Sequence, residues 1–377
     1  MLSFLNTRSV KQYSFTSYIN GVIMGWVKKY FFKIAKISYP LIHIPNTKKP
    51  EKGKILIISE VGGLGDAILF RRVLEAIKEK YDIYLITRRY HLPAYEDIIK
   101  KENLFIVTST SQLFQVSKRL KKEGVDILLL HGLSIISFVT TFIFFRKIGY
   151  KIGIFAEQAK GFLNKSFIAE NYDNVLDIYA DLTSYLGGTY SLLSFDKYKH
   201  YPIQKTTQVS VYIGSGSLCK NWRIKNFIEL FKLFDGAGIK YAIIGSTQDL
   251  EIVKPFLNQF PIRPTVIDSF LELTESILGS QVVICHNTSI LHLAVALGTK
   301  TISFNSKSNY TWWNPYKNFP TKEHIAFKAS DRECGYSQQF KSLLLHKNKC
   351  GCSLFDSIKP EMVFTAVNQL LSQSSEQ

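Results

Sequence analysis

The sequence predicts an α/β protein made of two doubly wound domains, each built on a parallel sheet. Short apolar runs alternate with amphipathic segments of helical length along most of the chain, a pattern typical of parallel βαβ units. The 377 residues exceed what one hydrophobic core usually supports. Between two such series, residues 194–208 are polar and lose the periodicity, so we place the interdomain linker there.

Composition indicates a globular, well-buried protein with an excess of basic side chains. Apolar residues make up 46% and charged residues 20%, which argues against a disordered chain. Lys and Arg number 47 against 30 Asp and Glu, a formal charge of +17. Such an excess favours an anionic membrane surface, a phosphorylated substrate or nucleic acid. Five cysteines in so long a chain do not make a disulfide framework and fit a reducing, cytoplasmic compartment.

Residues 1–50 form a basic and aromatic extension. The start lacks a charged segment followed by a continuous apolar core, so we expect no secretory signal. Residues 16–43 mix aromatic side chains with lysines, as an amphipathic helix on an acidic membrane surface would, although a helix packed on the protein fits equally well. The longest apolar run, residues 132–145, is too short to span a bilayer and is interrupted by Ser and Thr. It predicts a buried helix.

The first domain, residues 51–200, begins with a strand, a glycine-rich turn and a helix. Ile55 to Ile58 is a continuous apolar run, three glycines follow in the sequence GGLGD, and Asp66 opens the helix. The glycine spacing is not the GxGxxG of a dinucleotide site, which disfavours an NAD-dependent oxidoreductase. Asp66 is therefore either a helix cap or a catalytic carboxylate. Further strands are expected at residues 82–87, 104–108, 125–130 and 150–155.

The second domain, residues 208–355, begins with a strand at residues 209–213 and a loop of small residues, followed by Lys220 and an amphipathic helix at residues 226–234. Small residues with amide and hydroxyl donors, followed by a lysine, suit a diphosphate. The loop lacks the GK[ST] ending of a P-loop, which disfavours a Walker-type NTPase. The next strand, residues 241–244, leads to Asp249, which either accepts ribose hydroxyls or caps a helix.

The stretch Gln281 to Asn305 predicts a strand, a short loop, a helix and a second strand. His286, Asn287 and Thr288 end the apolar run with groups that cap helices. The helix N-terminus then offers amides and aligned peptide dipoles to an anion such as a phosphate. A buried, capped helix without any bound anion is the alternative.

Four motifs in this order and spacing resemble the ADP-heptose:lipopolysaccharide heptosyltransferases, family 9 of the glycosyltransferases. They are the GGLGD turn, the small-residue loop with K-x-W before a helix, a strand ending in Gly-x-x-x-Asp, and N-T-S-I-L-H-L-A-x-A-L-G-T-x-T-I. Residues 352–371 also resemble the family's closing I-x-P-E-x-V helix. We expect the C-terminal helix segment, residues 356–377, to pack back on the N-terminal domain. The resemblance covers about residues 54–371.

This resemblance implies a GT-B fold, in which two Rossmann-like domains face each other across a cleft. It implies an inverting transfer of a sugar, such as a heptose, from an ADP-sugar to lipopolysaccharide or a related envelope glycan, with no metal or other cofactor. Asp66 would be the general base. The enzyme would lie on the inner face of the cytoplasmic membrane. The residues expected to bind the donor are Ser215, Ser217, Lys220, Asp249, Asn287, Thr288, Ser289, Ile290 and His292.

The sequence departs from the family at the last of these motifs. The family usually has Asp-Thr-Gly where this chain has Asn287, Thr288 and Ser289. Losing the carboxylate removes an anionic acceptor for sugar hydroxyls, although Asn can still donate and accept. The departures predict either a different donor preference or lost activity, so an inactive sugar-nucleotide-binding module stays an alternative. A nucleic-acid-binding protein is another, and it rests on the net charge alone.

Two late features have open interpretations. Residues 309–316 are rich in Trp and Tyr, and they stack on the nucleotide base or acceptor sugar, or else pack against the domain. Some family members carry cysteines in this late part of the chain. The resemblance extends to the related autotransporter heptosyltransferases, which bind iron with four such cysteines. This chain offers either free thiols or a structural Cys₃His metal site, whose ligands would be Cys334, His346, Cys350 and Cys352.

Overall fold

The computed structural model describes residues 48–60, 62–108, 110–132, 148–155, 163–199, 205–215, 221–306, 310, 312–313, 316, 323–330 and 355–373. The helix predicted over residues 16–43 lies outside these residues, as does all but the first residue of the helix predicted over 132–145. The candidate metal ligands also lie outside them, namely Cys334, His346, Cys350 and Cys352.

The N-terminal half forms a six-stranded parallel sheet in the order β3-β2-β1-β4-β5-β6. Residues Ile55 to Ser59 of β1 and the whole of β4 are buried, because helices cover both faces of a doubly wound sheet. The strands are β1 (Gly53–Ser59), β2 (Tyr81–Thr87), β3 (Leu104–Ile106), β4 (Ile127–His131), β5 (Tyr150–Ile154) and β6 (Lys165–Phe167).

Among the helices of this half, α5 has clear signals at both ends and α2 is deeply buried. Helix α5 starts where the Asn174 side chain accepts the Leu176 amide at 2.9 Å, and it ends at Gly187 in the left-handed region. Helix α2 buries Ile68, Leu69 and most of its length. The helices are α2 (Leu64–Ile77), α3 (Thr110–Glu123), α5 (Val175–Leu186) and α6 (Asp196–Lys199), with short 3₁₀ turns η2 (Arg89–Ala94), η3 (Lys101–Asn103) and η5 (Ala169–Asn171).

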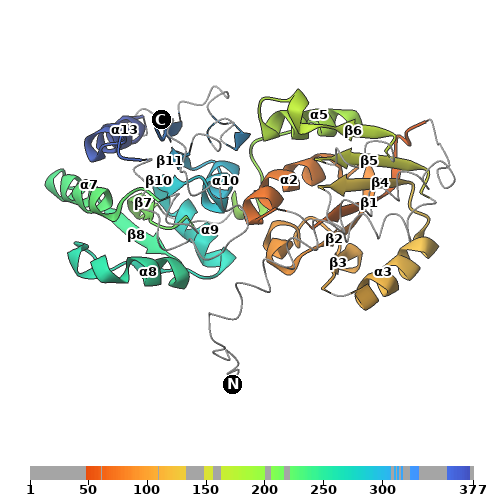
Figure 1. Cartoon of the computed structure of the whole chain (residues 1–377), viewed down its shortest axis with the longest axis horizontal. Helices are drawn as coiled ribbons and strands as arrows, with labels where there is room; N and C mark the ends of the chain where they lie inside the picture. Colours follow the sequence, from red (N-terminus) through yellow and green to blue (C-terminus); the bar gives the residue numbers. More distant parts are fainter. Residues whose placement is uncertain are drawn as a thin grey trace, which may run out of the picture.

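The C-terminal half repeats the plan in a second parallel sheet, ordered β12-β11-β10-β7-β8-β9. The two halves lie side by side (Figure 1). The strands are β7 (Thr207–Tyr212), β8 (Tyr241–Gly245), β9 (Thr265–Val266), β10 (Ser280–His286), β11 (Lys300–Asn305) and β12 (His324–Lys328). The helices are α7 (Ile224–Gly236), α8 (Thr247–Val253), η7 (Lys254–Gln259), α9 (Phe270–Leu278), α10 (Ser289–Ala296) and α13 (Pro360–Ser372).

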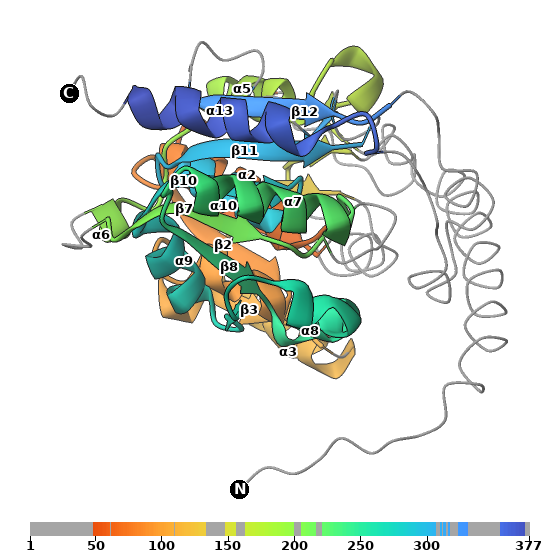
Figure 2. The same ribbon diagram turned by 90° about the vertical axis from the view of Figure 1, so that its left-hand side faces the viewer.

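The closing helix α13 corrects one expectation from the sequence. It packs on α7, β10 and β11 of the C-terminal domain and not on the N-terminal domain, and Figure 2 shows it beside β11 and α7. Its Val363 and Val367 are buried in the same cluster as Phe227 and Phe231 of α7. The apolar stripe of α13 therefore completes the core of its own domain.

The two domains share one buried apolar cluster, which runs from α2 and the first sheet to α10 and the second sheet. Helices α2 and α10 face each other at the centre of the molecule (Figure 1). Arg72 of α2 is 1% exposed and donates from Nη2 to the His292 carbonyl of α10 at 3.3 Å. Ser194, in the linker, donates its amide to the carbonyl of Ala296 at 2.9 Å. The domain interface is thus apolar packing with a few interdomain hydrogen bonds.

Candidate functional site

Asp66 stands at the start of α2, on the turn formed by the GGLGD motif. Gly62 has φ +84°, a left-handed conformation that favours glycine, and an ideal Cβ there would lie 2.5 Å from Asp66 Oδ2. The Gly63 amide donates to Asp66 Oδ2 at 2.6 Å. The carboxylate is half-buried, and this burial raises its pKa, an effect that the Gly63 hydrogen bond offsets only in part.

The end of β2 supports this turn. The Tyr90 hydroxyl donates to the Gly62 carbonyl at 3.0 Å, and His91 Nε2 lies 3.3 Å from the same oxygen. Both residues follow the strand that pairs with β1. The turn that carries Asp66 is therefore fixed from two sides.

The start of α10 supplies the candidate phosphate site. Thr288 is the N-cap, and its hydroxyl accepts the amide of Ile290 at 3.4 Å. Thr288, Ser289 and Ile290 are half-buried. Their position at a helix N-terminus directs amide donors and the positive end of the helix dipole toward an incoming anion.

The first turns of α2 and α10 meet at Gly65. An ideal Cβ on Gly65 would lie 2.9 Å from His292 Cδ2 and 3.4 Å from Ser289 Cα, so only a glycine allows this approach. Asp66 is the next residue along the chain. The structure therefore brings the predicted base and the predicted phosphate site together at one point of the domain interface.

His292 is buried at this interface. Its Nδ1 lies 3.0 Å from the Tyr316 hydroxyl, and 4% of the residue is exposed. Burial, with a smaller contribution from Arg72, lowers the pKa of His292 to about 3, so the ring is neutral at physiological pH. The ring thus has the environment of a satisfied core histidine, and its predicted contact with the donor phosphates stays a prediction.

His286, which sequence reasoning treated only as a strand-ending residue, holds the loop before α7. Its Nε2 accepts the Trp222 amide at 2.7 Å, and its Nδ1 lies 3.2 Å from the Gly214 carbonyl. Burial lowers the pKa of His286 to about 4, so the neutral ring donates from Nδ1. Both ends of the loop are thereby fixed. Ser215 is described and bonds to Asn221, whereas Ser217 and Lys220 lie outside the described residues.

Asp249 caps α8. Its Oδ2 accepts the Ser246 amide at 3.1 Å, and the Ser246 hydroxyl accepts the Asp249 amide at 3.2 Å. The carboxylate also lies against Gly214, where an ideal Cβ would be 2.0 Å from Oδ1. The capping role is thus seen, and the contact with a ribose stays a prediction. Asn287 lies at the end of β10 and donates from Nδ2 to Asn305 Oδ1 at 2.7 Å.

The sequence profile of glycosyltransferase family 9 (heptosyltransferase) matches residues 113–342. The chain belongs to glycosyltransferase family 9. It is accordingly a glycosyltransferase, as the motifs predicted. A comparison with curated protein sequences gives no match.

Solved structures of family 9 have the same fold. A glycosyl transferase family 9 protein from Veillonella parvula is 19% identical, with a TM-score of 0.66 over 86% of this chain and 99% of that one. E. coli ADP-heptose lps heptosyltransferase II is 15% identical, with a TM-score of 0.66 over 85% and 99%. E. coli heptosyltransferase WaaC with ADP is 13% identical, with a TM-score of 0.63 over 84% and 99%. The predicted GT-B fold is confirmed.

In this family 9 chain the late aromatic segment packs across the interface. Tyr316 is buried, and Trp312 lies edge-on to Phe155 of the N-terminal domain, with ring centroids 6.2 Å apart. Among residues 309–316 the structure describes 310, 312, 313 and 316. These aromatics thus pack within the interface, and Tyr316 also bonds to His292.

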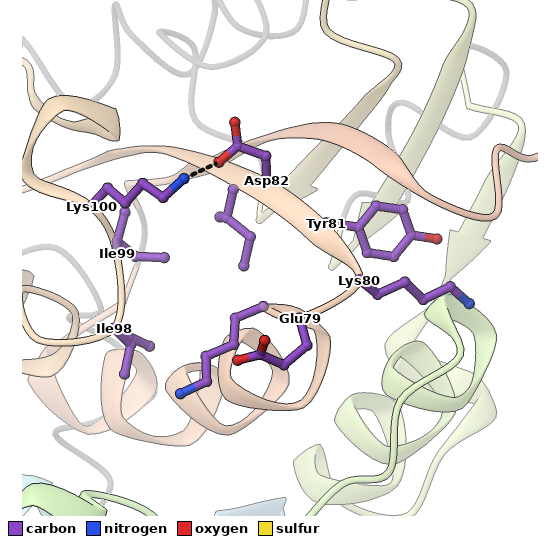
Figure 3. A pocket seen from close by; sticks show the side chains of 9 residues that line it. Glu79, Lys80, Tyr81, Asp82, Ile98, Ile99 and Lys100 are labelled. Atoms are coloured by element: carbon purple, nitrogen blue, oxygen red, sulfur yellow. Dashed lines mark hydrogen bonds and ion pairs between the residues drawn. The ribbon is translucent and has the colours of Figure 1, made fainter.

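Two hollows of the family 9 chain lie away from the point where α2 and α10 meet at Gly65. One, of about 530 Å³, borders the second half of α2 and the linker, with Arg72, Glu75 and Leu193 in its wall. The other, of about 230 Å³, lies where β2 begins, and Lys100 Nζ pairs there with Asp82 Oδ1 at 3.3 Å (Figure 3). Ligands of doubly wound folds bind beyond the carboxyl ends of the strands, so the hollow at the start of β2 is not the candidate active site.

No three His, Cys, Asp or Glu side chains of the described residues gather as a metal site requires. No helix among the same residues has the length and apolarity needed to cross a bilayer.

Proposed function

We propose that this glycosyltransferase is an inverting, metal-independent enzyme that moves a sugar, such as a heptose, from an ADP-sugar to lipopolysaccharide or a related envelope glycan. The E. coli WaaC structures hold ADP and ADP-2-deoxy-2-fluoro heptose, which supports an adenine nucleotide donor. The observation that carries the proposal is the meeting of α2 and α10 at Gly65, next to Asp66.

The start of α10 binds the donor diphosphate in this proposal. The amides of Ser289 and Ile290 and the Thr288 hydroxyl donate to phosphate oxygens, and Lys220 neutralises charge. These donors are fixed before the reaction, so they stabilise the negative charge that develops on the leaving diphosphate. The leaving group therefore needs no divalent cation.

Asp66 takes the proton of the acceptor hydroxyl. The acceptor oxygen attacks the anomeric carbon as the bond from that carbon to the diphosphate oxygen breaks, and ADP leaves with the bonding electrons. Attack from the face opposite the diphosphate inverts the configuration. The raised pKa of the Asp66 carboxyl makes it a stronger base than an exposed aspartate.

An anionic acceptor fits the surroundings of Asp66. Arg88 and Arg89 are exposed directly after β2, next to Tyr90, whose hydroxyl bonds to the turn of Asp66. These guanidinium groups suit the phosphates or carboxylates of an envelope glycolipid. Together with the charge of +17, they support a cytoplasmic enzyme on the inner face of the membrane.

Asp66→Asn tests the proposal, because the amide keeps the size of the carboxylate and removes its basicity. We expect transfer from ADP-heptose to a lipopolysaccharide acceptor to fall by about 10² to 10⁴-fold, with ADP affinity unchanged by calorimetry. A D66N variant that transfers at the wild-type rate would remove Asp66 from the mechanism.

An inactive sugar-nucleotide-binding module is the second candidate, favoured by Asn287 and Ser289 at the positions of the family's Asp and Gly. The argument from Ser289 is that a serine disfavours the positive φ that a glycine could adopt at this position, but position 289 does not need it. Ser289 is the first residue of α10 and is not among the described non-glycine residues with positive φ, which are Phe155 and Phe195. Turnover of any sugar nucleotide by the purified protein would exclude the inactive module.

A further inference from the structure

Asn305, at the end of β11, has an amide whose orientation its neighbours fix. The residue is 0% exposed. Its Nδ2 lies 3.0 Å from the Ser303 carbonyl, 3.0 Å from the Ser303 hydroxyl and 3.4 Å from the Phe327 carbonyl. Carbonyl oxygens only accept hydrogen bonds, so the amide nitrogen must face them. The Oδ1 of Asn305 consequently faces Asn287.

The group at position 287 must therefore donate. Asn287 does so from Nδ2, at 2.7 Å from Asn305 Oδ1. Its backbone amide donates to the Phe304 carbonyl at 3.0 Å, which holds the residue beside β11. An ionised carboxylate at position 287 would instead place one of its oxygens against Asn305 Oδ1. Two acceptors would then face each other beside the buried Asn305 amide, with no donor between them.

We propose that Asn305 is a positioning residue that commits position 287 to a neutral amide, and that this pair sets the charge of the donor site beside the diphosphate. Asn287 precedes Thr288, the N-cap of α10. With Nδ2 bonded to Asn305, the amide has a neutral oxygen left for a sugar hydroxyl. Compared with the Asp that the family usually has at this position, the site has one negative charge less beside the diphosphate. This consequence for the donor rests on the proposed function, whereas the pairing of the two side chains does not.

Among the described residues, four ionisable groups lie near this pair. Burial lowers the pKa of His286 to about 4 and that of His292 to about 3, so both rings stay neutral. Lys328 lies opposite Asn305 on β12 and carries a positive charge. Asp66 follows Gly65, the residue of α2 that α10 approaches, and burial raises its pKa. Each variant below keeps all four groups, so differences between variants report on position 287.

The first test compares the melting temperatures of wild type, Asn287→Asp (N287D) and Asn287→Ala (N287A) without ligand between pH 5 and pH 8. Burial and the facing oxygen should raise the pKa of the introduced carboxyl. N287D should melt several degrees below N287A at pH 8, and the gap should close toward pH 5, where the protonated carboxyl donates to Asn305. Equal melting of N287D and N287A at every pH would overturn the pairing.

Asn305→Ser (N305S) provides the matched control, because a serine hydroxyl can rotate and donate to a carboxylate. The double variant N287D/N305S should melt at pH 8 above the value that the two single changes predict by addition. If N287D fails to fold, the double variant should still fold. Failure of both, or strict additivity, would also overturn the pairing.

The second test measures ADP binding to the same variants by calorimetry. N287D should lose about tenfold or more in affinity at pH 8, equivalent to about 1.4 kcal/mol, and should recover toward pH 5. N287A should show a smaller loss that does not change with pH. A pH-independent N287D affinity equal to that of N287A would refute the effect on the donor site. A wild-type protein that binds no ADP would instead refute the proposed function, while the melting comparison would still decide on the pair.

Discussion

The close contact at Gly65 predicts that adding one methyl group at this residue pushes the catalytic site and the donor site apart. In Gly65→Ala the new Cβ would lie 2.9 Å from His292 Cδ2, whereas carbon atoms pack best at about 3.5–4.0 Å. The first turns of α2 and α10 must then move apart by about 0.6–1.1 Å. The His292 ring cannot swing away freely, because it is buried and bonded to Tyr316. A misplacement of about 1 Å is expected to lower the transfer rate by about 100-fold.

The stability of this variant should change much less than its activity. Overpacking costs about 1–3 kcal/mol, and replacing a helical glycine by alanine returns up to about 1 kcal/mol. The net loss in unfolding free energy is therefore about 2 kcal/mol or less.

The assay is transfer from an ADP-sugar alongside urea unfolding, with two matched controls. In Gly63→Ala the added Cβ would meet only Asp66 Oδ2, at 3.8 Å, and in Gly236→Ala, at the end of α7, it would meet nothing within 4 Å. Both controls should keep most of the activity. A Gly65→Ala enzyme with the wild-type rate and ADP affinity would refute the claim that the approach of the two helices matters.

Three further predictions concern single side chains. The contribution of His286 to stability should be complete above pH 6.5 and should be lost as the pH falls toward about 4, because burial depresses its pKa. The free-energy difference between wild type and His286→Phe in urea should therefore shrink by on the order of 3 kcal/mol; a constant difference would contradict the bond to Trp222. Lys220→Ala should weaken ADP binding by about 10-fold to 150-fold, the value of a charge-assisted hydrogen bond, and calorimetry showing no change would remove Lys220 from the donor site. Arg72→Met should hold or raise the unfolding free energy, because Nε and Nη1 of this buried cation have no hydrogen-bond partner among the described residues; a loss of several kcal/mol would show that the hydrogen bond of Arg72 to the His292 carbonyl and its attraction to the hydroxyls of Tyr190 and Tyr316 outweigh the cost of its burial.

Elements with continuous apolar runs could be predicted from the sequence. The apolar runs in β1, β4 and β10 predict strands that are buried on both faces. In the structure these strands begin and end within about two residues of the predicted positions. The short strands β6, β9 and β12 were missed, because their residues are largely exposed or half-buried and form no apolar run. Asp66 and Thr288 could be singled out because turn glycines and capping residues are local signals.

Residues whose roles depend on distant partners could not be found in this way. His286 acts through Trp222, 64 positions away, and Arg72 reaches His292 across 220 positions. The pairing of Asn287 with Asn305 likewise depends on β10 and β11 lying side by side. Local pattern gives the strands and caps, whereas tertiary contact decides which polar side chains are fixed.

The most direct measurement is a crystal structure of the protein with bound ADP. We expect the β-phosphate within hydrogen-bond distance of the Ser289 and Ile290 amides, at the end of α10 that lies nearest Asp66. A diphosphate bound away from the start of α10, or on a face turned from Asp66, would contradict this expectation.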